Sequence, residues 1–305
     1  MKPAVYFGWH THGWEDLLAL TRRAEARGYA AVFIDGDVSM LQKRPRVDCL
    51  DGWTATVALL ASTEHIPIGS LRLVHHWNAA RLAQAAASAA RIAPGRLRFA
   101  VGVGDWPVDA RFGLAFPTTA QRVAWLAESL DAVRALWRGE PVTRNGQYVK
   151  LDGAQLRPAP GSEIPISIAA RRPRMLELVA KYADVWDVNL PPLREPVVAA
   201  AEQLASACAA RGRNSAEIGR SQLLFARPGA TPPEALAEFR RFNPWFRDFR
   251  DTELEPQLIC GDPAACRGQL QRLATELGLT LPVIDASGLP MGAAETLLEA
   301  LGPAE

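Results

Sequence analysis

Three histidines and two aspartates in the first third of the sequence have side chains that could move protons. His10, His75 and His76 follow short apolar runs, and Asp35 and Asp37 follow another. Histidine has an unperturbed pKa of about 6.5, so it can donate or accept a proton near neutral pH. We therefore consider the histidines as candidate acid/base groups and the aspartates as groups that orient them or a substrate. Each could instead be an ordinary polar residue that is hydrogen-bonded within the fold.

Tryptophans accompany these polar residues and could pack against a flat ring system. Trp9 lies in one such segment, Trp77 and Asn78 lie in a second, and Asp105 and Trp106 lie in a third. We predict that Trp77 and Asn78 contact a cofactor. We predict that Trp9, Asp105 and Trp106 contact a substrate.

An arginine-rich turn in the middle of the chain indicates a phosphate site. Arg171, Arg172 and Arg174 follow Ala170 where an apolar run turns into a helical stretch, and Pro173 stands in the first helical turn. A helix N-terminus offers free N–H groups and a positive partial charge, and arginine adds paired donors. The alternative is a solvated basic turn, which is what charge runs usually are.

Two glycines close to another apolar run bear on which cofactor could bind and how near it could come to the backbone. Gly102 and Gly104 do not complete a G-x-G-x-x-G pattern, so the sequence does not support a Rossmann-type dinucleotide site. We expect them to let a ligand ring approach the backbone.

Composition limits the class of protein. The 305 residues are 49% hydrophobic and 22% charged with a net charge of +1, so we expect a globular protein without a global attraction to nucleic acid or to a membrane. Four cysteines are too few for a disulfide scaffold, and their spacing fits no common zinc site, so no metal is expected. No export signal or membrane-spanning run is visible, and we expect a cytoplasmic protein with free thiols.

Apolar runs alternate with helical periodicity along the whole chain. The predicted strands are residues 4–9, 31–35, 66–74, 97–103, 165–170, 185–188, 220–226 and 281–285. The predicted helices are residues 14–27, 53–63, 79–92, 118–138, 173–182, 195–211, 263–277 and 291–301. Eight such units without a linker predict a single (β/α)8 TIM barrel over residues 1–305, with its active site at the carboxyl ends of the strands.

Two insertions interrupt this alternation. Residues 140–161 contain turn residues and Asn145-Gly146, which predicts a loop with a short hairpin after the fourth strand and its helix. Thr231-Pro232-Pro233-Glu234 predicts an additional helix after the seventh strand. We expect both insertions to shape the substrate pocket.

Several motifs in this order resemble the bacterial luciferase-like monooxygenase family, whose members use a flavin or coenzyme F420. The resemblance covers nearly the whole chain. It is carried by residues 24–29 (AEARGY), 61–69, 94–97 (PGRL), 101–104 (VGVG), 122–128, 136–142 (LWRGEPV), 146–148 (GQY), 157–160 (RPAP) and 173–186.

The resemblance implies a reduced flavin or deazaflavin across the strand ends, with its phosphate near the turn after the fifth strand. Members of the family commonly have a catalytic histidine after the aspartate that ends the second strand, where this chain has Asp37-Val38. The loop after the third strand reads Trp77-Asn78-Ala79 without the usual proline, and Arg172 replaces the usual glycine. These departures favour specialised chemistry.

Four functions remain open at this point. The leading hypothesis is a monooxygenase that uses reduced FMN, supplied by a separate reductase, and oxygen on a small organic substrate. The second is an F420-dependent hydride-transfer oxidoreductase with its own F420 reductase, and the third is a flavin-binding barrel without turnover. A sugar-phosphate isomerase or aldolase ranks last, because Lys43, Lys150 and Lys181 do not follow predicted strands. In each case we expect a homodimer, which the apolar helix faces and the resemblance favour.

Overall fold

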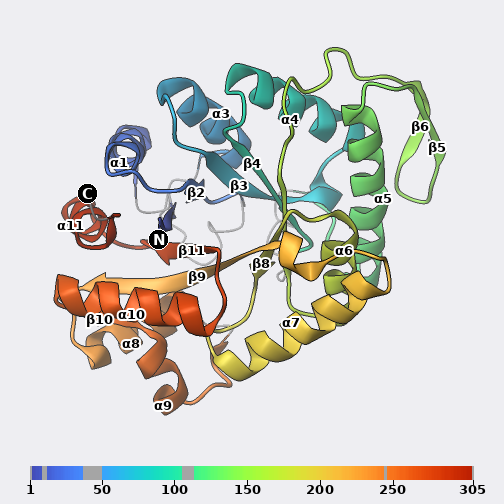
Figure 1. Cartoon of the computed structure of the whole chain (residues 1–305). Helices are drawn as coiled ribbons and strands as arrows, with labels where there is room; N and C mark the ends of the chain where they lie inside the picture. The colour runs from blue at the N-terminus through green and yellow to red at the C-terminus, as the bar shows by residue number, and fades with distance from the viewer. Residues whose placement is uncertain (1, 9–11, 37–49, 105–112, 244–245, 304–305) are drawn as a thin grey trace.

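Eight parallel strands close into a barrel (Figure 1). The computed structural model describes residues 2–8, 12–36, 50–104, 113–243 and 246–303. The barrel strands are β1 (Ala4–Phe7), β2 (Val32–Ile34), β3 (Ile68–Leu73), β4 (Leu97–Gly102), β7 (Ile166–Ala170), β8 (Val185–Val188), β9 (Gly219–Pro228) and β11 (Leu281–Asp285). Each pairs in parallel with its neighbours, and the β8–β9, β9–β11 and β11–β1 pairings complete the ring. The predicted (β/α)8 barrel is confirmed.

Helices cover the outside of the barrel, with one long helix after each strand. They are α1 (Trp14–Ala26), α3 (Gly52–Ser62), α4 (Ala79–Ile92), α5 (Thr119–Trp137), α6 (Pro173–Tyr182), α7 (Arg194–Ala209), α10 (Pro263–Glu276) and α11 (Met291–Leu301). The helix predicted over residues 118–138 is α5, and it begins with a capping box in which Thr118 and Gln121 bond each other's backbone. The main buried apolar cluster joins the outward sides of the strands to these helices. No helix among the described residues is both long and apolar enough to cross a membrane.

A smaller apolar cluster fills the barrel near the amino-terminal ends of its strands. Ala4, Ala31 and Val283 are buried there, and Tyr6 and Phe33 pack against them. Side chains alternate between the two faces of a strand, so these residues identify which positions face the lumen.

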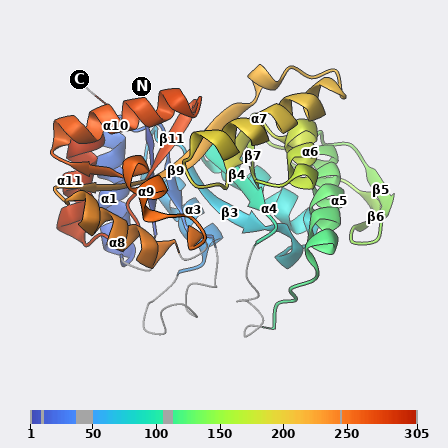
Figure 2. The same ribbon diagram turned by 90° about the horizontal axis from the view of Figure 1, so that it is seen from below.

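The hairpin of the first insertion lies on the outside of the molecule, beyond α5 (Figures 1 and 2). Its strands are β5 (Val142–Asn145) and β6 (Lys150–Ala154). The Glu128 carboxylate on α5 accepts hydrogen bonds from the backbone N–H groups of Gln147, Tyr148 and Val149, at 3.2, 2.9 and 3.0 Å. The hairpin is present as predicted, but the expectation that it shapes the pocket is wrong, because it follows a helix and packs on that helix.

The second insertion lies at the end of β9, on another side of the barrel. It contains α8 (Pro232–Phe242), the short helix α9 (Asp251–Leu254) and β10 (Ile259–Gly261), which pairs with the last residues of β9. The helix α8 was predicted from its cap. The three-residue strand β10 was not, because so short a run has no measurable period. A separate apolar cluster joins these elements to β9.

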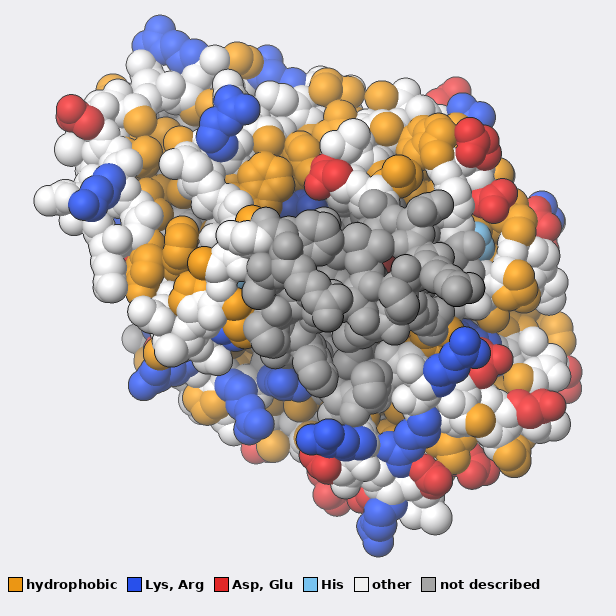
Figure 3. Space-filling view, turned by 180° about the vertical axis from the view of Figure 1, so that it is seen from behind, with side chains coloured by type: hydrophobic (Ala, Val, Ile, Leu, Met, Phe, Trp, Pro, Cys, Tyr) orange, Lys and Arg blue, Asp and Glu red, His pale blue; other side chains and the backbone are white. Residues whose placement is uncertain are grey.

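Charges of both signs occur together on the surface. On the face opposite to that of Figure 1, Lys and Arg side chains lie among Asp and Glu side chains along the edges (Figure 3). This distribution accords with the net charge of +1.

Candidate functional site

Register identifies the side chains that face the lumen near the carboxyl ends of β1, β9 and β11. Leu223 pairs with Val283, and both Phe225 and Tyr6 pair with Asp285. Residues in register on parallel strands point to the same side, so Leu223, Phe225, Tyr6 and Asp285 all face inward. Leu223 is 45% exposed although it lies on a barrel strand, which shows that the lumen is open at this level.

Asp35 lies inside this mouth, as predicted, and is buried. The hydroxyl of Tyr6 on β1 donates a hydrogen bond to its Oδ1. Asp285 is also buried, and its Oδ1 accepts a hydrogen bond of 2.9 Å from the backbone N–H of Ser287. Burial raises the pKa of Asp285, and the negative charge of Asp35 raises it further, against the opposing effects of Ser287 and Arg227.

His75 and His76 form a pair in the 3-10 turn that follows β3. Their ring centroids are 4.2 Å apart, and His75 also lies 6.0 Å from the ring of Phe116. The buried Nε2 of His75 makes no hydrogen bond within the described part of the chain. Burial, together with the positive charges of His76 and Arg122, lowers the pKa of His75 to about 4. His75 is therefore a neutral imidazole at physiological pH and can accept a proton.

Arg122 on α5 holds the loop after β4. Its guanidinium is buried, donates to the carbonyls of Val103 at 2.7 Å and Gly104 at 3.1 Å, and lies 3.8 Å from the ring centroid of Phe116. Gly104 has φ +68°, a conformation that favours glycine. Arg122 thus fixes the backbone at Gly104, and the approach of a ligand ring there stays a prediction.

Small residues line the lumen beside this loop. A Cβ on Gly102 would lie 3.3 Å from Leu71 and 3.7 Å from the Cβ of Ala169. The predicted contact residue Ala170 faces the other way, because it is buried in the cluster under the helices and its carbonyl accepts from the indole of Trp186 at 2.9 Å. Ala169, not Ala170, therefore has its side chain toward the lumen, and a contact between Ala170 and the cofactor stays a prediction.

The turn from β7 into α6 carries the predicted phosphate-site residues. Arg172 is at the N-cap position with no capping hydrogen bond from its side chain, and Pro173 begins the helix. Arg172 and Arg174 are exposed, and Arg171 is half-buried. A helix start with exposed guanidinium groups fits a phosphate.

Of the remaining predicted contact residues, two already contact other groups of the protein, and the others lie outside the described residues. Trp77 packs against Trp53, with ring centroids 6.4 Å apart. Asn78 caps α4, since its Oδ1 accepts from the N–H groups of Ala80 and Arg81 at 3.0 and 3.1 Å, so this oxygen is already used. Trp9, His10, Asp37, Asp105 and Trp106 lie outside the described residues.

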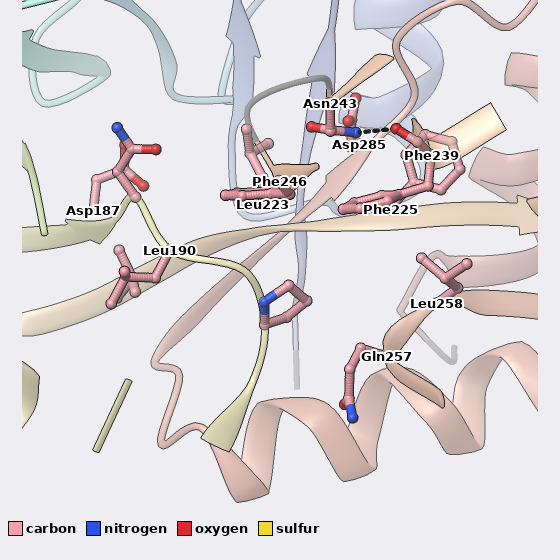
Figure 4. Close-up of a pocket in the computed structure, with 13 residues that line it drawn as sticks. Asp187, Leu190, Leu223, Phe225, Phe239, Asn243, Phe246, Gln257, Leu258 and Asp285 are labelled. Atoms are coloured by element: carbon pink, nitrogen blue, oxygen red, sulfur yellow. Dashed lines mark hydrogen bonds between the residues drawn. The ribbon is translucent and has the colours of Figure 1, made fainter. Parts of the chain in front are cut away.

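A cavity of about 100 Å³ opens between the ends of β8, β9 and β11 and the second insertion. Figure 4 shows Asp187 and Leu190 on one side of it, and Phe225, Phe239 and Leu258 on the other. The residues that line it are Asp187, Val188, Asn189, Leu190, Pro192, Leu223, Phe225, Phe239, Asn243, Phe246, Gln257, Leu258 and Asp285. Part of the second insertion shapes this cavity, as expected.

Part of this cavity is recognisable from the sequence. Asp285 ends the eighth predicted strand, and Asp187 lies in the sixth. Asp35 is a candidate because it ends a predicted barrel strand, where active-site residues lie, and the same reason applies to Asp285. Burial raises the pKa of Asp187 to about 6, although a hydrogen bond from Ser221 lowers it. Asp187 is thus partly protonated in mildly acidic solution.

The model of a known family matches most of the chain. Residues 5–281 match the family described as luciferase-like monooxygenase. The chain belongs to the luciferase-like monooxygenase family, and it is an enzyme of that family. The resemblance inferred from the motifs is confirmed.

Curated relatives are more specific about the cofactor. A protein of Nakamurella multipartita named F420-dependent glucose-6-phosphate dehydrogenase is 29% identical over 226 residues, which cover 66% of this chain and 65% of the relative. A Mycobacterium tuberculosis protein named F420-dependent hydroxymycolic acid dehydrogenase is 27% identical over 223 residues, or 72% of this chain and 61% of the relative. The chain thus spans less than two thirds of the length of these relatives.

Solved structures share the fold over the whole chain. An F420-dependent secondary alcohol dehydrogenase in complex with an F420-acetone adduct superposes with a TM-score of 0.84 at 18% identity, covering 99% of both chains. The long-chain alkane monooxygenase LadA gives a TM-score of 0.77 at 15% identity, covering 100% of this chain and 93% of the other.

Proposed function

We propose that this enzyme is an F420-dependent oxidoreductase that interconverts an alcohol and its carbonyl compound. The observation that carries the proposal is that the curated relatives reported above are both named as F420-dependent dehydrogenases. Reduced FMN was the leading expectation from sequence, and these relatives favour the alternative. In the direction of carbonyl reduction, a separate F420 reductase would regenerate the reduced cofactor.

The residues present fit a deazaflavin. Arg172 and Arg174 would hold its phosphate at the start of α6, and the small residues Gly102 and Ala169 leave room for a flat ring at the mouth. When bound, oxidised F420 would supply a hydride acceptor for the carbon of the alcohol.

The alcohol must also lose its hydroxyl proton. We propose His75 as the acceptor, because its imidazole is neutral and its buried Nε2 makes no hydrogen bond among the described residues. Tyr6 would fix Asp35 at the mouth so that this carboxylate orients either the substrate or the base.

An anaerobic titration tests the cofactor assignment. The protein is titrated with oxidised F420 and separately with FMN, with the visible absorption band and the flavin fluorescence as readouts. Binding of F420 at micromolar or lower Kd, with FMN at least about tenfold weaker, is expected. Tighter binding of FMN would overturn the assignment.

Turnover separates hydride transfer from the oxygen-dependent alternative, which the monooxygenase among the structural neighbours keeps open. Bleaching of the F420 band by a panel of alcohols without oxygen is expected. Oxygen consumption with reduced FMN and no F420 reduction would instead favour the monooxygenase. Cofactor binding without any turnover over the panel would favour a non-catalytic barrel.

A further inference from the structure

We propose that the substrate of this enzyme is an uncharged alcohol, or the matching ketone, with an apolar flank, and that the cavity at the ends of β8, β9 and β11 rejects phosphorylated and carboxylated compounds. This inference rests on the proposed function and specifies its substrate class.

The cavity walls are mostly aromatic and aliphatic. Phe225, Phe239 and Phe246 are buried and form one connected group, with ring centroids 5.5 and 5.9 Å apart for the two pairs that include Phe239. Figure 4 shows Leu258 beside these rings and Leu190 on the opposite side. An apolar flank of a ligand would replace water against these surfaces.

The polar groups of the cavity are carboxyls and carboxamides. Asp187, Asp285, Asn243 and Gln257 contribute side chains, whereas no Lys, Arg or His is among the described residues that line it. The amide nitrogen of Asn243 already donates to the carbonyl of Phe239 at 3.1 Å, which leaves its oxygen as an acceptor. The cavity therefore offers mainly acceptors, which a hydroxyl group can satisfy.

Arg227, a buried cation that acts electrostatically on Asp285, is committed to other partners. Arg227 on β9 donates to the carbonyls of Ala226, Asp285 and Ser287 at 2.7, 3.1 and 2.6 Å, and its Nε lies 2.5 Å from Glu238. Its guanidinium thus supports the end of β11 from behind the cavity. A phosphate in the cavity would meet two carboxyl groups without a free cation to balance its charge.

The two carboxyls can also bind an uncharged ligand. Burial raises the pKa of both Asp187 and Asp285, so each is protonated more readily than an exposed carboxyl. A protonated carboxyl still donates one hydrogen bond and accepts another. This is the pattern that a hydroxyl or a ketone oxygen needs.

The cavity is continuous with the barrel lumen. Leu223 and Asp285 line the cavity and also face the lumen, where Asp285 is in register with Tyr6. A substrate whose apolar flank lies in the cavity would thus present its carbinol group, beside Asp285, toward the mouth. In the oxidation direction the carbinol C–H bond breaks and its hydride reduces F420, the O–H bond breaks and its proton goes to a base, and a C=O bond forms.

The first test measures ligand binding to the protein without cofactor. The probes are α-methylbenzyl alcohol and mandelate, in which a carboxylate replaces the methyl group, and binding is followed by calorimetry. Binding of the alcohol at least about tenfold tighter than mandelate is expected. Equal or tighter binding of mandelate, or no binding of the alcohol, would overturn the inference.

The second test uses the F420-loaded enzyme and three variants. Asp187→Asn and Asp285→Asn are expected to raise the KM for the alcohol at least about threefold, to narrow its kcat/KM advantage over mandelate by a similar factor, and to leave F420 affinity unchanged. Asp152→Asn, the same change at an exposed residue on the outer hairpin, is the matched control and should alter none of these. Unchanged discrimination in both cavity variants would contradict the inference.

Failure of this inference and failure of the proposed function give different results. Glucose and glucose-6-phosphate form a second matched pair, since several relatives are named for the phosphorylated sugar. If F420 binds and glucose-6-phosphate reduces it with a kcat/KM equal to or above those of glucose and the alcohol, the cofactor assignment stands and the substrate class is wrong. If F420 does not bind but the cofactor-free protein prefers the alcohol, the cavity argument stands and the cofactor assignment is wrong.

Discussion

The phenol of Tyr6 and the carboxylate of Asp35 are joined by a hydrogen bond across the ends of β1 and β2. The pair fixes a charged side chain at a mouth that is open at the level of Leu223. A carboxylate held in this way has one defined orientation, which a group that positions substrate requires.

Replacement of Tyr6 by phenylalanine removes this donor and leaves the shape of the ring. Because a hydrogen bond to a charged group is lost, we expect Tyr6→Phe to lower the free energy of unfolding by about 1–3 kcal/mol, measured by urea denaturation. Tyr148→Phe is the matched control, since the Tyr148 hydroxyl makes no hydrogen bond within the described residues, and it should change stability by less than about 0.5 kcal/mol. Equal effects of the two changes would show that the Tyr6–Asp35 bond contributes nothing.

The arginines at the start of α6 should control cofactor affinity. Arg172→Ala or Arg174→Ala should weaken F420 binding at least about tenfold, or by about 1.4 kcal/mol, because each removes a cationic donor from the predicted phosphate site. Absorbance titration measures this effect. Arg138→Ala, an exposed arginine after the far end of α5, should leave the affinity unchanged. An unchanged F420 affinity in both α6 variants would show that the phosphate binds elsewhere.

His75 should make the protein less stable in acid. Its pKa falls from 6.5 to about 4 on folding, so between these values the unfolded chain binds a proton that the folded chain does not. The free energy of unfolding should therefore decrease as the pH falls from 6.5 to about 4, by about 1–3 kcal/mol from this group. His75→Gln should flatten that part of the urea-denaturation profile. His65→Gln, the same change at an exposed histidine, is the control and should leave the profile unchanged. A wild-type profile for His75→Gln would refute the lowered pKa of His75.

Asp187 should have the opposite dependence on pH. Its pKa rises from 3.8 to about 6 on folding, so the folded chain holds a proton more tightly, and this stabilisation is lost as the pH rises through 6. Asp187→Asn should thus be more stable than the wild type at pH 8 by about 1–3 kcal/mol, and the difference should shrink at pH 4. Thermal and urea unfolding at the two pH values measure it. The same stability difference at both values would show that the carboxyl does not titrate as described.

Much of the barrel is predictable from sequence because its signals are local. Caps such as the Thr118–Gln121 box mark helix starts, and apolar runs of similar length mark the strands. Some residues that carry the family resemblance also stabilise the barrel through hydrogen bonds. Glu25, for example, accepts hydrogen bonds from the backbone N–H groups of residues 64, 65 and 66, which positions the loop before β3.

The candidate site is less predictable because a side chain's direction depends on a single step in register. Ala170 and Ala169 differ by one position, yet one packs under the helices and the other faces the lumen. Asn78 has a side chain that suits ligand binding, but capping of α4 uses its oxygen. The cavity that contains Asp187 and Asp285 forms where β9, β11 and the second insertion pack together. These segments are far apart in the sequence, so no local sequence pattern predicts that they come into contact.

The division between the α6 turn and the β9 insertion has an evolutionary consequence. The predicted cofactor contacts lie at or after the ends of β3, β4 and β7, whereas the cavity lies at β8, β9, β11 and the insertion that ends in β10. Exchange of residues 229–258 in an ancestor would therefore change one wall of the cavity, and with it the substrate range, while the predicted cofactor contacts are retained. The same boundary offers protein engineers a natural site for constructing chimaeras.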